Sequence, residues 1–130
     1  MSDSIQNVTE EGDISMAKIN DIYTKCVDPT ACPVETTLNI IGGKWKTVIL
    51  YHLLNKTIRF NEFQRLMPDI SQRMLTRQLR ELEKDGIIHR EVYNEIPPKV
   101  EYSMTEFGYT LKPIILAMRD WGEEYIETVL

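Results

Sequence analysis

The segment that decides how the rest of the chain is interpreted is SQRMLTRQLRELEKDG, residues 71–86. Ser71 is a favourable N-cap for a helix, and Gly86 is a favourable residue just beyond a helix end. Four apolar side chains between them recur at the spacing of one helix face: Met74, Leu75, Leu79 and Leu82. We therefore predict an amphipathic helix over residues 71–85 that buries its apolar face.

The opposite face of this predicted helix is cationic and polar. With one residue about every 100°, five side chains fall on or beside the face that points away from the leucines: Gln72, Arg73, Thr76, Arg77 and Arg80. Arginine can pair with guanine or hold phosphates, and glutamine can pair with adenine. Three arginines on a helix are also common as a plain solvated face, so this pattern alone leaves both interpretations open.

The segments before this helix are helical in pattern. Residues 33–41 start with Pro33, which suits a first helical turn, and end at Gly42-Gly43. Residues 45–54 continue the helical spacing. Residues 60–67 predict a short helix that ends at Pro68, and its inward side chains are predicted to be Phe60, Phe63, Leu66 and Met67. The short interval between this helix and Ser71 is typical of a helix-turn-helix.

After Gly86 the pattern changes to alternation with a period of two. Residues 88–93 and 99–104 predict a β-hairpin with its loop at 94–98, so that residues 87–104 would form a wing. Lys99 would be available to a phosphate or to the minor groove. Thr105 can cap a last helix over about 105–128, with a kink expected at Pro113 and an apolar stripe along it. The predicted fold class is mainly α with a small β-hairpin wing.

Length, composition and charge agree with one domain that acts inside the cell. The 130 residues are 42% hydrophobic and 27% charged, which allows one domain, expected over residues 14–130 after a disordered acidic arm at 1–13. The arm does not resemble a secretory signal, and no apolar run approaches the roughly 20 residues that span a bilayer. We expect a cytoplasmic protein without a membrane partner. The net charge of −5 opposes nucleic-acid binding overall, but residues 71–80 contain no carboxylate.

Six segments occur in this order along the chain: CPVE (32–35), IIGGKW (40–45), RFNEF (59–63), ISQRML (70–75), LRELEKDG (79–86) and PPKVEY (97–102). Together they resemble the HxlR-type transcriptional regulators, which are relatives of the MarR group. The resemblance implies a homodimer on a pseudo-palindromic operator in double-stranded DNA, with 71–85 as the recognition helix and a wing that extends to Lys99. It also implies dimerisation through N- and C-terminal helices, and we expect a repressor.

Cys32 is the candidate for sensing. It precedes a predicted helix that begins at Pro33, where the positive end of the helix dipole favours a thiolate. Some HxlR-type regulators use a cysteine at this Cys-Pro-Val-Glu position to sense oxidants or electrophiles, so the resemblance implies that role for Cys32. The alternative is a buried, inert thiol. Cys26 has no counterpart in the resemblance, and a structural disulfide is not expected in a reducing cytoplasm.

Other function classes have less support in the sequence. No nucleophile with an adjacent base and no paired carboxylates indicate an enzyme, and His52 and His89 lack metal-ligand spacing. We therefore expect neither catalysis nor a metal or other cofactor. The remaining alternative is a winged-helix module that binds another protein, for which the arginine face would not be needed.

Overall fold

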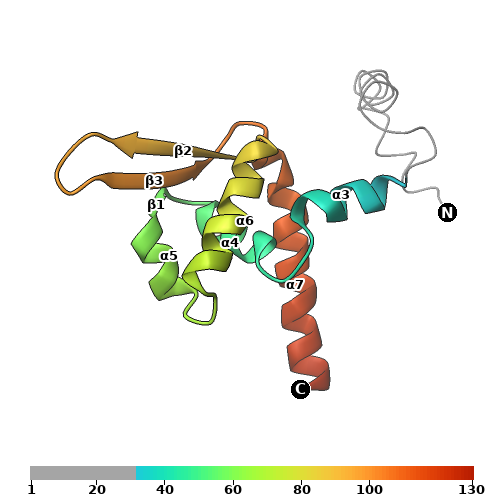
Figure 1. Cartoon of the computed structure of the whole chain (residues 1–130). Helices are drawn as coiled ribbons and strands as arrows, with labels where there is room; N and C mark the ends of the chain where they lie inside the picture. The colour runs from blue at the N-terminus through green and yellow to red at the C-terminus, as the bar shows by residue number, and fades with distance from the viewer. Residues whose placement is uncertain (1–31) are drawn as a thin grey trace. The chain divides into compact units, whose positions relative to one another are not determined.

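The computed structural model describes residues 32–130 (Figure 1). The predicted arm at 1–13, the start of the predicted domain at residue 14 and Cys26 lie outside the described residues. Residues 37–130 form one compact unit, whose fold is given below; residues 32–36, with the start of the first described helix, belong to a separate unit. The elements in order are α3 (Pro33–Ile41), α4 (Lys46–Leu53), β1 (Ile58–Arg59), α5 (Phe60–Leu66), α6 (Gln72–Lys84), β2 (Ile88–Tyr93), β3 (Lys99–Met104), a 3₁₀ helix η1 (Gly108–Leu111) and α7 (Lys112–Val129).

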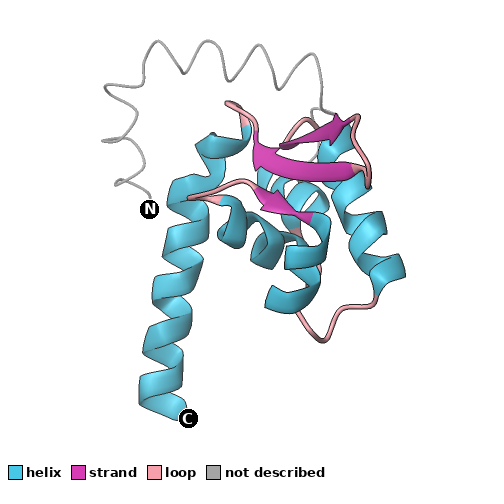
Figure 2. Cartoon of the chain, turned by 90° about the vertical axis from the view of Figure 1, so that its left-hand side faces the viewer, coloured by secondary structure: helices cyan, strands magenta, loops and turns pink. Residues whose placement is uncertain are grey.

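A small sheet and the helices around it form the winged helix fold (Figure 2). The strands are antiparallel in the order β1-β3-β2, and the β2–β3 hairpin pairs from Ile88 opposite Met104 to Tyr93 opposite Lys99. This hairpin matches the predicted strands. The third strand, β1, places Ile58 opposite Tyr102 and was not predicted, because two residues are too few to show a period. Among residues 32–130, no helix has both the length and the apolar character needed to cross a membrane.

The core is built from side chains of nearly every element in Thr37–Leu130. Its most deeply buried members are Ile49, Leu50, Leu53, Ile58, Phe63, Leu75, Leu79, Leu82, Ile88 and Ile115. The short helix α5 corrects one prediction, because Leu66 is 39% exposed. Placed at 100° per residue, Phe60 and Met67 fall on one side of Phe63, whereas Leu66 falls on the other side, toward solvent. Phe63 also meets Tyr102 edge to face, with ring centroids 6.1 Å apart.

Both ends of α6 follow from single residues. The Ser71 hydroxyl oxygen accepts a hydrogen bond from the Met74 N–H at 3.0 Å, which is an N-cap. After the helix, Gly86 adopts a φ of +78°, and the Ile87 N–H donates to the Leu82 carbonyl at 3.0 Å. This left-handed residue is the usual way to satisfy the last carbonyls of a helix, and it directs the chain into β2. The observed helix agrees with the one predicted over residues 71–85.

The last helix starts later than predicted. The α-helix begins at Lys112 rather than near Thr105, and η1 fills the interval. Pro113 lies in the first turn of α7, where its missing N–H costs no helical hydrogen bond, so the predicted kink is absent. The Thr105 hydroxyl accepts from the Gly108 N–H at 2.9 Å and donates to the Gly86 carbonyl at 2.7 Å. Thr105 therefore caps the turn that leads into η1, as the sequence suggested for a helix start, and it also links this turn to the end of α6.

Gly108 should be intolerant of any side chain. A Cβ built there would overlap the carbonyl oxygen of Ile87, which is backbone and cannot rotate away. We expect Gly108→Ala to lower the free energy of unfolding by about 1–3 kcal/mol, measured by urea denaturation. Gly122→Ala in α7 is the matched control, because an added methyl there meets no described atom within 4 Å. Equal stability of the wild type and Gly108→Ala would show that this contact is absent.

Candidate nucleic-acid interface

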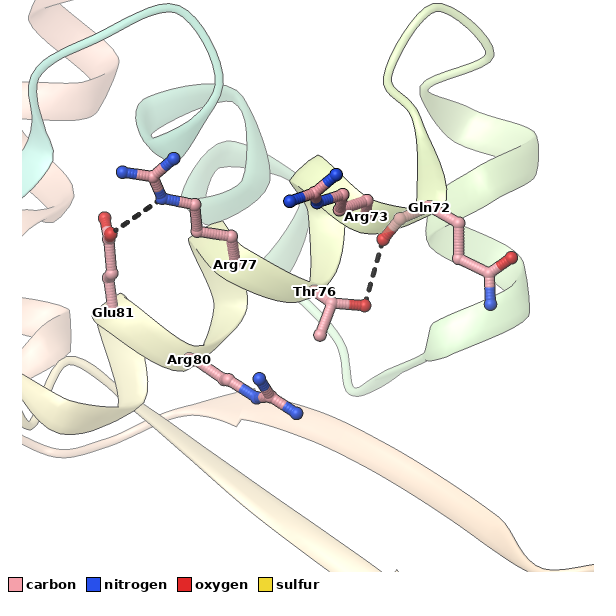
Figure 3. A pocket seen from close by; sticks show the side chains of 6 residues that line it. All are labelled: Gln72, Arg73, Thr76, Arg77, Arg80 and Glu81. Carbon is pink, nitrogen blue, oxygen red and sulfur yellow. Dashed lines mark hydrogen bonds and ion pairs between the residues drawn. The ribbon is translucent and has the colours of Figure 1, made fainter.

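The polar face of α6 lines an open hollow (Figure 3). Its lining consists of Gln72, Arg73, Thr76, Arg77, Arg80 and Glu81. In this view Arg73 and Arg77 extend to one side of the helix, while Arg80 and Thr76 extend to the other. The structure thus gathers five of the predicted site residues on one accessible surface. Cationic side chains lie on both sides of the helix axis.

The members of this surface differ in how strongly they are held. The Thr76 hydroxyl donates to the Gln72 carbonyl at 2.9 Å, and the Ser71 hydroxyl is occupied as the N-cap, so both have structural roles. Arg77 Nε donates to Glu81 Oε2 at 3.3 Å, although the Arg77 side chain is still 69% exposed. Within residues 32–130, no carboxylate pairs with Arg73 or Arg80, and both are exposed. These two guanidinium groups are the ones most available to an outside anion.

A buried lysine of α4 forms an ion pair with a glutamate of α6. Lys46, in the first turn of α4, is the one buried polar or charged residue among residues 32–130, and its Nζ lies 2.7 Å from Glu81 Oε1. This hydrogen bond, followed by the one from Arg77, lowers the pKa of the Glu81 carboxyl below its ordinary value. Sequence reasoning missed this pair. The one signal in the sequence was a lysine at the start of a largely apolar helix, and its pairing with Glu81 depends on how the two helices pack.

Arg90 of β2 extends the cationic surface toward the wing. It lines a second hollow with Thr76 and Arg80 of α6, and Tyr102 lies opposite it in the sheet. Arg90 is exposed and was not predicted as a site residue. The signal was present, because Arg90 occupies an alternating position between Ile88 and Val92 where an apolar side chain would be expected. Arg90 is therefore added, on structural grounds, to the candidate site residues that the sequence predicted.

Lys99 lies apart from this surface. Its Nζ is 3.7 Å from a Glu101 carboxylate oxygen, 4.0 Å from a Glu95 carboxylate oxygen and 4.4 Å from the ring centroid of Tyr93. The Tyr93 hydroxyl also hydrogen-bonds Glu101, which raises the pKa of Tyr93. Lys99 lines neither of the two α6 hollows. A phosphate would have to compete with two carboxylates for its charge.

Cys32 lies at the start of α3 and is exposed. Its carbonyl accepts the Thr36 N–H at 3.0 Å and the Thr36 hydroxyl at 3.4 Å, which makes Cys32 the residue that flanks the first helical turn. The thiol is therefore next to the N-terminal end of a helix, as the sequence predicted. The alternative of a buried thiol is wrong.

The last helix exposes a large apolar stripe. Its exposed members are Ile114, Met118, Trp121, Tyr125, Ile126 and Val129. Trp121 is 66% exposed, and its ring stacks on Tyr125 with centroids 5.4 Å apart. Contiguous exposed apolar side chains of this size mark interaction surfaces in soluble proteins.

The arrangement of a short helix, a tight turn, an amphipathic helix and a wing matches a known family. The HxlR-like helix-turn-helix family matches residues 40–129. The chain belongs to this family. The match covers α4 to the end of α7, so it includes both α6 hollows, the wing and the exposed stripe of the last helix. Cys32 lies before the matched range.

Relatives and solved structures of HxlR-like proteins agree with this assignment. The chain is 67% identical over 102 residues to the HTH-type transcriptional regulator YdeP of Bacillus subtilis. This match covers 78% of this chain and 80% of YdeP. The redox regulator HypR in its oxidised form matches at 66% identity and a TM-score of 0.70, over 72% of this chain and 96% of HypR. Its reduced form matches at 61% identity and a TM-score of 0.73, over 75% and 97%. This HxlR-like chain is a helix-turn-helix transcriptional regulator.

The Lys46–Glu81 pair should make folding stability depend on pH. Because the pKa of Glu81 is lowered in the folded protein, its stabilising effect is complete above the ordinary value of 4.5 and disappears as the pH falls through the folded-state pKa. We expect Glu81→Gln to be less stable than the wild type at pH 7, because it leaves the buried Lys46 ammonium without its anion. The difference in urea midpoint should shrink as the pH falls below 4.5.

Glu62→Gln is the control for this experiment. Glu62 accepts a hydrogen bond from Lys56 at 2.7 Å, but the Lys56 side chain is 54% exposed, so loss of that pair should cost little. A Glu81→Gln variant as stable as the wild type at pH 7 would contradict a stabilising role for the buried pair.

Proposed function

We propose that this regulator is a homodimeric cytoplasmic repressor that inserts α6 into the major groove of a pseudo-palindromic operator in double-stranded DNA. The observation that carries the proposal is the exposed arginine face of α6, whose Arg73 and Arg80 lack a carboxylate partner in residues 32–130. A groove about 12 Å wide accepts an α-helix, and arginine offers paired donors to guanine or charge to phosphates. We do not assign catalysis to this surface.

The roles of the individual side chains follow from their surroundings. Arg73 and Arg80 would supply base or phosphate contacts, and Gln72 at the first turn could pair with adenine. Ser71 and Thr76 would act mainly by holding the first turns of α6, because their hydroxyls already make bonds within the helix. Arg90 would contact the DNA phosphate backbone beside α6. Lys99 would contribute less to DNA affinity than the sequence predicted, because a carboxylate lies close to its ammonium group.

The proposed dimer rests on the exposed stripe of α7. Trp121, Tyr125 and Ile126 present apolar area to solvent that a second copy could cover. A two-fold interface between identical helices would repeat α6 on both sides of the axis. A pseudo-palindromic operator, with half-sites about one helical turn apart, is the DNA geometry that fits such a dimer.

The arginine face is tested by replacing Arg73, Arg77 and Arg80 with alanine. We expect the affinity for DNA upstream of the regulator's own gene or a neighbouring operon to fall at least about 100-fold, measured by fluorescence anisotropy. The slope of log affinity against log salt should become less steep by about 2 to 3, because fewer phosphate counterions are released. Unchanged affinity would reject DNA recognition by α6 and favour the protein-interaction module.

Two controls make this result specific. Lys44→Ala removes an exposed cation in the turn before α4, outside both α6 hollows, and should bind DNA like the wild type. Light scattering and circular dichroism of the triple variant should show the same oligomeric state and helix content as the wild type. Loss of DNA binding by a triple variant that is unfolded or changed in assembly would not count as evidence about the interface.

We further propose that Cys32 senses oxidants or electrophiles. The thiol is exposed beside the first turn of α3, and HypR, a redox regulator, is 66% identical in sequence. An oxidant would accept two electrons as the Cys32 thiol and a second thiol lose their protons and form a disulfide. An electrophile such as an aldehyde would instead add to the sulfur. Either change, at the junction before α3, would alter how the dimer holds its two recognition helices.

The sensing proposal is tested by operator release in the presence of diamide or methylglyoxal. The wild type should release operator DNA at concentrations that leave Cys32→Ser bound, because serine cannot form the adduct or the disulfide. Electrophoretic mobility shift measures the release, and dithiothreitol should reverse the effect of diamide. Equal release by both proteins would remove Cys32 from the mechanism without affecting the proposal for α6.

A further inference from the structure

A third hollow, rich in cationic side chains, lies where α4 packs against α7. It has a volume of about 440 Å³ and lies outside the α6 surface. The end of α4 and the turn after it contribute Tyr51, His52 and Lys56, and α7 contributes Lys112 and Arg119. Its lining, all within residues 51–119, contains two lysines and one arginine and no carboxylate. Pockets for small molecules in proteins have volumes of this order.

The cations are only partly neutralised by neighbours. Lys56 Nζ donates to Glu62 at 2.7 Å, and Arg119 donates to Asp120 at 3.0 and 3.1 Å and to the Tyr51 hydroxyl. Within residues 32–130, no carboxylate pairs with Lys112, and its side chain is exposed. The two carboxylates that pair with the other cations are not part of the lining. The hollow therefore carries a net positive charge toward whatever enters it.

The remaining lining offers hydrogen bonding and apolar surface. Burial and the positive charge of Lys56 lower the pKa of His52, so its imidazole is neutral near pH 7 and can donate one N–H without adding charge. Leu54 and Leu116 also line the hollow and supply an apolar surface. Inorganic phosphate would use the cations but not the leucines. A molecule with one carboxylate and a small apolar body would use both.

We propose that the hollow between α4 and α7 binds a small organic carboxylate, with Lys112 and Arg119 holding the carboxylate and the leucines contacting the apolar part. This site shares no lining residue with the two hollows of the α6 surface. Its two helices lead to the proposed DNA surface and to the proposed dimer surface, because α4 carries Lys46, which pairs with Glu81 of α6, and α7 carries the exposed apolar stripe. A bound ligand would connect the helix that supports recognition with the proposed dimer helix.

Benzoate is the probe, with inorganic phosphate as the comparison at constant ionic strength. Isothermal titration calorimetry of the full chain should detect benzoate binding that is stronger than phosphate binding. The double variant Lys112→Gln and Arg119→Gln should bind benzoate about tenfold or more weakly, because two charge-assisted contacts are lost. Arg65→Gln, which removes an exposed cation of α5 outside the hollow, should bind like the wild type.

Histidine ring signals in nuclear magnetic resonance spectra give a second readout that does not depend on affinity. The chain has two histidines, and His89 lies on β2, where it pairs with Glu91 at 2.8 Å, outside the hollow. Saturating benzoate should shift the ring signals of His52 and leave those of His89 unchanged. The proposal is overturned if benzoate does not bind, if the double variant binds it as well as the wild type, or if phosphate binds as tightly as benzoate.

Discussion

The burial of one leucine face on α6 is the constraint on which the rest of the regulator depends. Leu75, Leu79 and Leu82 are at most 1% exposed, and burying each is worth about 1.5–3 kcal/mol relative to solvent exposure. A rotation of the helix about its axis would expose all three leucines and bury arginines in their place. The core therefore fixes which side chains α6 presents to solvent. Exposure of Arg73 and Arg80 is a consequence of packing on the other side of the helix.

The Lys46–Glu81 pair adds direction to this packing. Apolar burial is non-directional, whereas a buried ammonium is stabilised only where it meets its anion. Glu81 also accepts a hydrogen bond from Arg77, so one carboxylate joins the buried side of α6 to its exposed side. The same contact explains why Arg77 is less free than Arg73 or Arg80, although the helix pattern treats the three arginines alike.

The sequence predicted the elements with strong local signals and missed those that depend on tertiary contacts. The bounds of α6 and of the hairpin follow from caps, a glycine stop and alternation, which are local. Strand β1 pairs only with β3, and Thr105 bonds back to Gly86, a residue 19 positions earlier in the chain, before η1 and α7 begin. At the site, the α6 residues were predicted from one helical period. Arg90 and Lys46 were not, because their roles depend on which other element they meet.

An acidic chain can still present a DNA-binding surface, because electrostatic attraction at a contact is local. The net charge is −5, and the carboxylates of Glu123, Glu124 and Glu127 lie on the last helix rather than on α6. At physiological ionic strength the Debye length is about 8 Å, so exposed charges more distant than this are largely screened at the arginine face. The overall negative charge would then weaken attachment to DNA through other faces of the protein. The positions of the charges would then select one docking face for DNA. Burial of the leucine face of α6 sets those positions, because it turns the arginines of α6 toward solvent.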